Sequence, residues 1–137
     1  MENKWLSKAL EFMKLERFKV ALHCCERGLQ INARDHQLLI LKGNIMEKFG
    51  EYHKALDCYD AATEANPKSA QAWFNKGAIH GNFGQYRKAL GCFQEAHRQG
   101  HPNATEAIRQ CQDALSREEM PLKPKSQPPG RSRNKFR

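Results

Sequence analysis

The sequence predicts an all-α protein in which a helix–turn–helix unit is repeated and its copies stack on one another. A shift of 34 residues aligns residues 36–69 with 70–103 at twelve identical positions, and a further shift reaches a weaker copy at 2–35. Within the copies, apolar residues recur at spacings of three and four, as they do along one face of an α-helix. A fixed period is typical of stacked units, each of which buries its apolar face against a neighbour.

Each copy is predicted to hold two amphipathic helices joined by a short turn. Phe49-Gly50-Glu51-Tyr52 and Phe83-Gly84-Gln85-Tyr86 supply this turn in the second and third copies. Glycine favours it because the turn often needs a positive φ. Asn66-Pro67 ends the second copy, since proline disfavours helix in the residue before it. The first copy keeps Lys8, Ala21, Leu22 and Cys24 in common with both later ones.

The segment after the third copy divides into a last helix and a tail. Residues 103–117 carry an apolar stripe and are predicted to form a helix that covers the end of the stack. Residues 119–137 are rich in proline and poor in apolar side chains, so we expect them to remain unfolded. Six of the eight units of net positive charge lie in this tail, on Lys123, Lys125, Arg131, Arg133, Lys135 and Arg137.

The repeats resemble the tetratricopeptide repeat (TPR) family. The third copy carries the family's tryptophan and glycine as Trp73 and Gly77, and the second ends its pattern with Pro67. The first copy departs from the pattern, with Cys25 where an aromatic residue is usual. The resemblance implies a right-handed α-solenoid of about seven helices. Its TPR domain would span residues 2–118, with repeats at 2–35, 36–69 and 70–103 and a capping helix at 103–117.

The cysteines and histidines do not favour a catalytic, cofactor or metal site. Cys24, Cys58 and Cys92 recur at the repeat period, and equivalent residues of packed helices lie too far apart for a disulfide or a zinc site. His97 and His101 have the spacing of a helical metal pair, but Gly100 is expected to end the helix between them. We therefore expect a non-enzymatic protein without a cofactor, and no activated nucleophile or phosphate loop is evident.

The predicted compartment is the cytoplasm. No apolar run approaches the ~20 residues that a transmembrane helix needs, and Met1 leads into charged, amphipathic sequence rather than a signal peptide. Buried thiols also suit a reducing compartment.

The TPR resemblance implies that the first helix of each copy lines a concave groove that receives a partner protein. Helical geometry places eleven residues there: Leu6, Leu10, Met13, Gln37, Ile40, Asn44, Gln71, Phe74, Asn75, Ile108 and Arg109. Asparagine can pair with a partner's backbone, since its side chain both donates and accepts hydrogen bonds. The largely apolar remainder favours a hydrophobic segment or an amphipathic helix as the ligand.

A specialised form of this groove binds the carboxylate end of a chaperone tail with two lysines, two asparagines and an arginine. Asn44, Asn75 and Arg109 match three of these five places, but Ile40 and Thr105 stand where the lysines belong. The main prediction is therefore a scaffold or adaptor for another protein segment.

Several alternatives remain open. The protein could be a small TPR chaperone, or it could self-associate through the groove. Its own tail could cover the groove through Leu122 and Phe136. The basic tail could also contact nucleic acid or an anionic membrane, through a salt-dependent attraction of low specificity.

Overall fold

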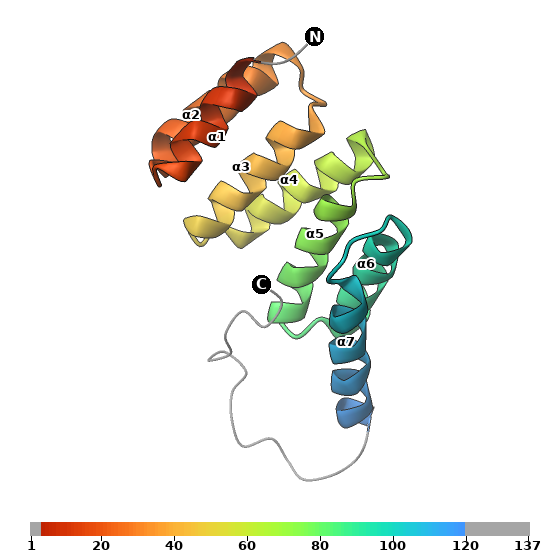
Figure 1. Ribbon diagram of the computed structural model, residues 1–137. Helices are drawn as coiled ribbons and strands as arrows, with labels where there is room; N and C mark the ends of the chain where they lie inside the picture. The colour runs from red at the N-terminus through yellow and green to blue at the C-terminus, as the bar shows by residue number, and fades with distance from the viewer. Residues whose placement is uncertain (1–3, 120–137) are drawn as a thin grey trace. The chain divides into compact units, whose positions relative to one another are not determined.

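A computed structural model describes residues 4–119, and these residues form seven α-helices and no strand (Figure 1). The helices are α1 (Lys4–Lys14), α2 (Phe18–Ile31), α3 (His36–Lys48), α4 (Tyr52–Ala65), α5 (Ala70–Asn82), α6 (Tyr86–Arg98) and α7 (Ala104–Glu119). The last helix therefore begins and ends within two residues of the predicted range. The basic residues predicted to form the tail's charge, from Lys123 to Arg137, lie outside the described residues.

The chain divides into two compact units, and each has its own packing. In the first unit, α1 packs against α2, α2 against α3, and α3 against α4, while α1 also contacts α3. In the second unit, which starts at Ser69, α5 packs against α6 and α6 against α7. In both units, the first helix of each copy therefore packs against the second helix of the same copy. The extent of a single TPR domain over residues 2–118 stays a prediction.

The turns within the copies take the predicted left-handed conformation. Gly50 and Gly84 have φ values of +77° and +79°. Glu16 holds the equivalent place in the first copy, 34 residues before Gly50, and has a φ of +58°. A side chain with a Cβ atom adopts this conformation at a cost of about 1 kcal/mol. The first copy therefore uses the same turn without its best-suited residue.

In the second and third copies, a glycine on the first helix packs against an aromatic ring on the second helix. A Cβ atom added to Gly43 would lie 2.5 Å from the ring of Tyr59, and one added to Gly77 would lie 2.8 Å from Phe93. Both rings are fully buried. The absence of a side chain on the first helix therefore makes room for the ring of the second.

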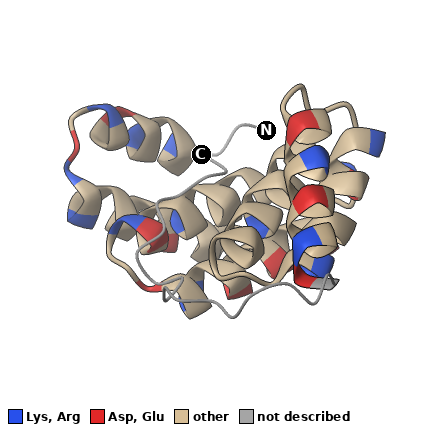
Figure 2. Ribbon diagram, turned by 90° about the horizontal axis from the view of Figure 1, so that it is seen from below, with Lys and Arg blue, Asp and Glu red and all other residues tan. Residues whose placement is uncertain are grey.

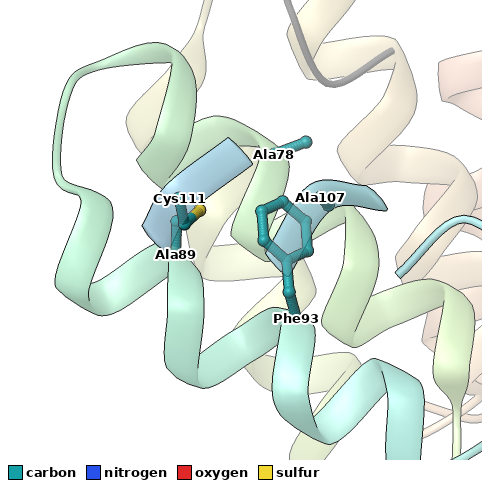
Figure 3. Packing of buried hydrophobic residues seen from close by; sticks show 5 residues of the cluster. All are labelled: Ala78, Ala89, Phe93, Ala107 and Cys111. Atoms are coloured by element: carbon teal, nitrogen blue, oxygen red, sulfur yellow. The ribbon is translucent and has the colours of Figure 1, made fainter. Parts of the chain in front are cut away.

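The second unit has a buried apolar cluster, to which α5, α6 and α7 all contribute (Figure 3). Ala78 comes from α5, Ala89 and Phe93 from α6, and Ala107 and Cys111 from α7. Phe93 is the only large side chain among the five, and it is fully buried. The small residues around it allow the three helices to approach one ring.

All five cysteines are buried thiols that take part in packing. Cys24 and Cys25 are both buried, and their helix α2 packs against both α1 and α3. Burial raises the pKa of the Cys25 thiol to about 12, so this side chain stays protonated and unreactive at neutral pH. Cys25 occupies the place of Tyr59 and Phe93, and Ala9 occupies the place of Gly43 and Gly77.

Candidate functional site

The first unit brings six of the predicted groove residues onto two helices that contact each other. Leu6, Leu10 and Met13 lie on α1, and Gln37, Ile40 and Asn44 lie on α3. Leu10 is 44% exposed on a helix that packs against two others. Gln37 is also exposed, and the other four are half-buried. This surface, which we call the α1–α3 face, offers both apolar and polar contacts.

Asn44 is held in place by a buried tyrosine. The Tyr59 hydroxyl on α4 lies 2.6 Å from Asn44 Oδ1 and 2.7 Å from Glu47 Oε1, both on α3. A phenol has a single proton, so it donates to one of these oxygens at a time. The Tyr59 hydroxyl therefore orients the Asn44 side chain, and the Glu47 carboxylate lies beside it. A ligand at this point of the α1–α3 face meets a fixed amide next to a negative charge.

The second unit places two other predicted groove residues in contact with each other. Gln71 Nε2 donates a hydrogen bond of 2.6 Å to Asn75 Oδ1, one turn further along α5. Gln71 is exposed and Asn75 is half-buried. The two amides form a polar strip along α5, and a bound segment would compete with this internal hydrogen bond.

Phe74 and Ile108 serve the packing of the second unit as well as its surface. The Phe74 ring stacks on His101 with a centroid distance of 4.1 Å and an interplanar angle of 2°. It also packs against Phe93, with the ring centroids 5.1 Å apart. Both Phe74 and Ile108 are half-buried against the apolar cluster of Figure 3. Phe74 is therefore bound on one side by the core and on another by the α6–α7 turn.

The α6–α7 turn depends on a neutral His101. Its Nδ1 accepts a hydrogen bond of 3.1 Å from the Asn103 N–H, and burial lowers the pKa of its imidazole from the ordinary value of about 6.5. We expect stability to fall as the pH drops below about 6.5, because the unfolded chain then takes up a proton that folded His101 resists. The loss stops once the pH is below the pKa of the folded state.

Urea unfolding of the wild type and of His101→Phe over this pH range checks the expectation. The variant keeps a ring against Phe74 but cannot titrate, so its stability should depend less on pH. An equal dependence in both proteins would show that His101 does not contribute. The slope decides the test, since the variant also loses the hydrogen bond from Asn103.

Arg109 is already bound by carboxylates of its own helix. It donates hydrogen bonds to Glu106 and, over 3.2 Å, to Asp113. All three side chains are exposed. The hydrogen bond from Arg109 lowers the pKa of Glu106, and the same contact raises the pKa of Arg109. A carboxylate ligand would have to displace these partners to reach the guanidinium.

No group of three His, Cys, Asp or Glu side chains within residues 4–119 is arranged to hold a metal ion. None of the described helices is both long enough and apolar enough to cross a membrane.

Comparison with known families decides what kind of repeat this is. Two family models, each described as a tetratricopeptide repeat, match residues 36–69 and 58–91. The chain is a tetratricopeptide repeat protein. The first match coincides with the predicted second copy, and the other joins the end of that copy to the start of the next. No curated protein matches the sequence.

Solved structures with the same fold include TPR domains and a type III secretion translocator chaperone. The first TPR of Spaghetti (RPAP3), bound to the HSP90 peptide SRMEEVD, is 15% identical with a TM-score of 0.77, over 85% of this chain and 97% of the other. The Sgt2 TPR domain from Aspergillus fumigatus is 16% identical with a TM-score of 0.79, over 91% and 85%. The Yersinia enterocolitica translocator chaperone SycD is 15% identical with a TM-score of 0.74, over 85% of each chain. At these identities the likeness establishes the fold, which confirms the predicted α-solenoid of TPR type.

Two residues that position this TPR protein's candidate surface were missed in the sequence. Tyr59 is absent from the predicted groove residues, although its hydroxyl is hydrogen-bonded to Asn44. His101 is absent from them too, although its ring stacks on Phe74. One signal for Tyr59 was present, because Tyr59 lies 16 positions after Gly43, as Phe93 does after Gly77. Nothing in the sequence indicates which ring His101 would contact.

Proposed function

We propose that this TPR protein is a non-enzymatic adaptor that binds a peptide or short helical segment of a partner protein on the first helices of its repeats. Leu10 carries the proposal. It is 44% exposed on α1, on a helix that packs directly against α3. Exposed aliphatic side chains beside fixed polar groups suit a ligand with an apolar face, because burial of the aliphatic group favours binding and the polar groups fix orientation.

The chemistry of the surface argues for an apolar ligand rather than an acidic one. The similar RPAP3 domain was solved with a peptide that contains two glutamates and an aspartate. In this chain, Ile40 and Thr105 replace the expected lysines, Glu47 stands beside Asn44, and Arg109 is bound by Glu106 and Asp113. Bringing a further carboxylate to either place would bring like charges together, so capture of an acidic tail is disfavoured.

Affinity purification with the full chain, followed by mass spectrometry, would identify the partner, and point variants would then test the surface. Leu10→Ser should weaken binding of the identified segment by about ten- to a hundredfold, since burial of a leucine contributes about 1.5–3 kcal/mol. Titration calorimetry with wild type and variant measures this difference.

Leu15→Ser is the matched control. Leu15 is the same residue type just beyond the end of α1 and is 60% exposed. Its replacement should leave the affinity within about twofold. Equal affinities of wild type and Leu10→Ser for the verified partner would contradict the proposed surface. Asn44→Ala and Phe74→Ala are less suitable tests, because each also removes an internal contact, with Tyr59 or with His101.

Three alternatives from the sequence analysis stay predictions: a small chaperone, self-association, and binding of nucleic acid or an anionic membrane by the tail. The likeness to SycD concerns the fold, and a role as a small chaperone would still use a protein segment as ligand. Sedimentation of the full chain at several concentrations separates self-association from binding of a partner. Retention of nucleic acid or anionic vesicles by the full chain, but not by a chain with its six tail cations replaced by glutamine, would assign those ligands to the tail.

A further inference from the structure

Two helix pairs among the described residues carry an excess of positive charge. Within α1 and α2 there are five Lys and Arg against two Asp and Glu. Within α5 and α6 there are four against one. Positive and negative residues are interspersed along the ribbon (Figure 2), so the excess of positive charge is local and does not form a uniformly positive surface. The first helix pair therefore carries a local excess of positive charge, and the arrangement of its cations is what sets it apart.

Three cations of this pair gather around one indole. The Nζ atoms of Lys4 and Lys8 lie 5.8 Å and 5.0 Å from the centroid of the Trp5 ring, and Arg27 Cζ lies 5.3 Å from it. All three cationic side chains are exposed. Among residues 4–119, no carboxylate is within ion-pair distance of any of them. The negative face of the ring partly offsets their repulsion, and an external anion would offset it further.

An exposed apolar side chain lies one helical turn from Arg27. Ile31 is 70% exposed, the largest value among the exposed large hydrophobic residues of the described chain. It follows Arg27 by four positions on α2, so the two share one face of that helix. We call Lys4, Trp5, Lys8, Arg27 and Ile31 the Trp5 cluster.

The Trp5 cluster is separate from the α1–α3 face. At about 100° per residue along α1, Lys4 and Lys8 lie on one side of the buried Ala9, and Leu6 and Leu10 lie on the other. A ligand on the cluster therefore does not occupy the surface to which the adaptor function is assigned.

We propose that the Trp5 cluster is a second docking surface, which binds an acidic protein segment that carries an apolar side chain. The cations supply charge complementarity, and Ile31 supplies an apolar contact that a phosphate backbone cannot use. Stacking of a nucleobase is disfavoured, because Trp5 is half-buried and the cations already lie over its ring. An acidic, apolar segment uses every feature of the cluster.

A short synthetic peptide of glutamate and leucine is the probe. Its binding is followed through the Trp5 emission of the full chain carrying Trp73→Phe, which leaves one indole as the reporter. The triple variant Lys4→Gln, Lys8→Gln, Arg27→Gln should bind about tenfold more weakly, as expected from three exposed ion pairs. Ile31→Ser should weaken binding of this peptide but not of a glutamate and serine peptide. Circular dichroism verifies that the variants keep their helices.

Lys76→Gln is the matched control, because Lys76 lies 5.3 Å from the Trp73 ring at the place equivalent to Lys8. It should leave the affinity unchanged. Equal binding by wild type and triple variant would overturn the proposal, and so would failure of the wild type to bind the glutamate and leucine peptide. Tighter binding of oligouridylate than of this peptide, unaffected by Ile31→Ser, would also overturn it in favour of a nucleic-acid ligand.

Discussion

Phe93→Ala is expected to lower the free energy of unfolding of the protein by about 3–5 kcal/mol. The Phe93 ring is fully buried, and its neighbours Ala78, Ala89 and Ala107 are too small to fill the space that it would leave. The substitution also removes the ring that packs against Phe74. Urea unfolding followed by circular dichroism measures the loss.

Phe83→Ala is the control for this prediction. Phe83 is the same residue type in the same unit, but it is 56% exposed at the end of α5. Its replacement should change the stability by less than about 1 kcal/mol. Similar losses for the two variants would mean that the cluster around Phe93 is not the core of the second unit.

Gly77→Ala is expected to destabilise the protein by up to about 2 kcal/mol, although alanine is the better helix former. Alanine gains about 1 kcal/mol in an exposed helix position. Here its Cβ atom would lie 2.8 Å from the Phe93 ring and 3.1 Å from Cys92 Cβ, and overpacking of this kind costs about 1–3 kcal/mol. A ring that is fully buried cannot move aside without disturbing the neighbouring helices.

Gly91→Ala separates overpacking from helix propensity. Gly91 lies within α6, is exposed, and has no atom within 4 Å of the position that a Cβ would take. This variant should be more stable than wild type by about 0.5–1 kcal/mol. If Gly77→Ala were stabilised to the same extent, the close approach of α5 and α6 would be refuted.

The helices and turns could be predicted because the residues that recur at the repeat period are those that pack between helices or form the turns. Gly50 and Gly84 identified the turns, and both have the positive φ that their position requires. The family match at residues 36–69 coincides with a copy found by self-comparison alone. Each copy adopts the same backbone conformation, so evidence from one copy supports the prediction for the next copy.

The roles of individual surface side chains could not be predicted in the same way. Phe74 was assigned to the floor of a groove because of its helical position, but the turn between α6 and α7 brings His101 against its ring. Arg109 was matched to a ligand-binding place, but two carboxylates on its own helix already bind it. Such contacts depend on the path of a turn and on rotamers, and neither follows from residue spacing.

The first copy has Ala9 and Cys25 where the later copies have a glycine and an aromatic residue, and this difference limits which helices can be exchanged between copies. In the first copy the equivalent positions hold Ala9 and Cys25, both fully buried, whereas in the second copy Gly43 faces the Tyr59 ring. A chimaera that joined the first helix of one copy to the second helix of the other would either bring Ala9 against Tyr59 or leave a void between Gly43 and Cys25. The interchangeable module of this protein is therefore the matched helix pair, and single helices are not portable between copies.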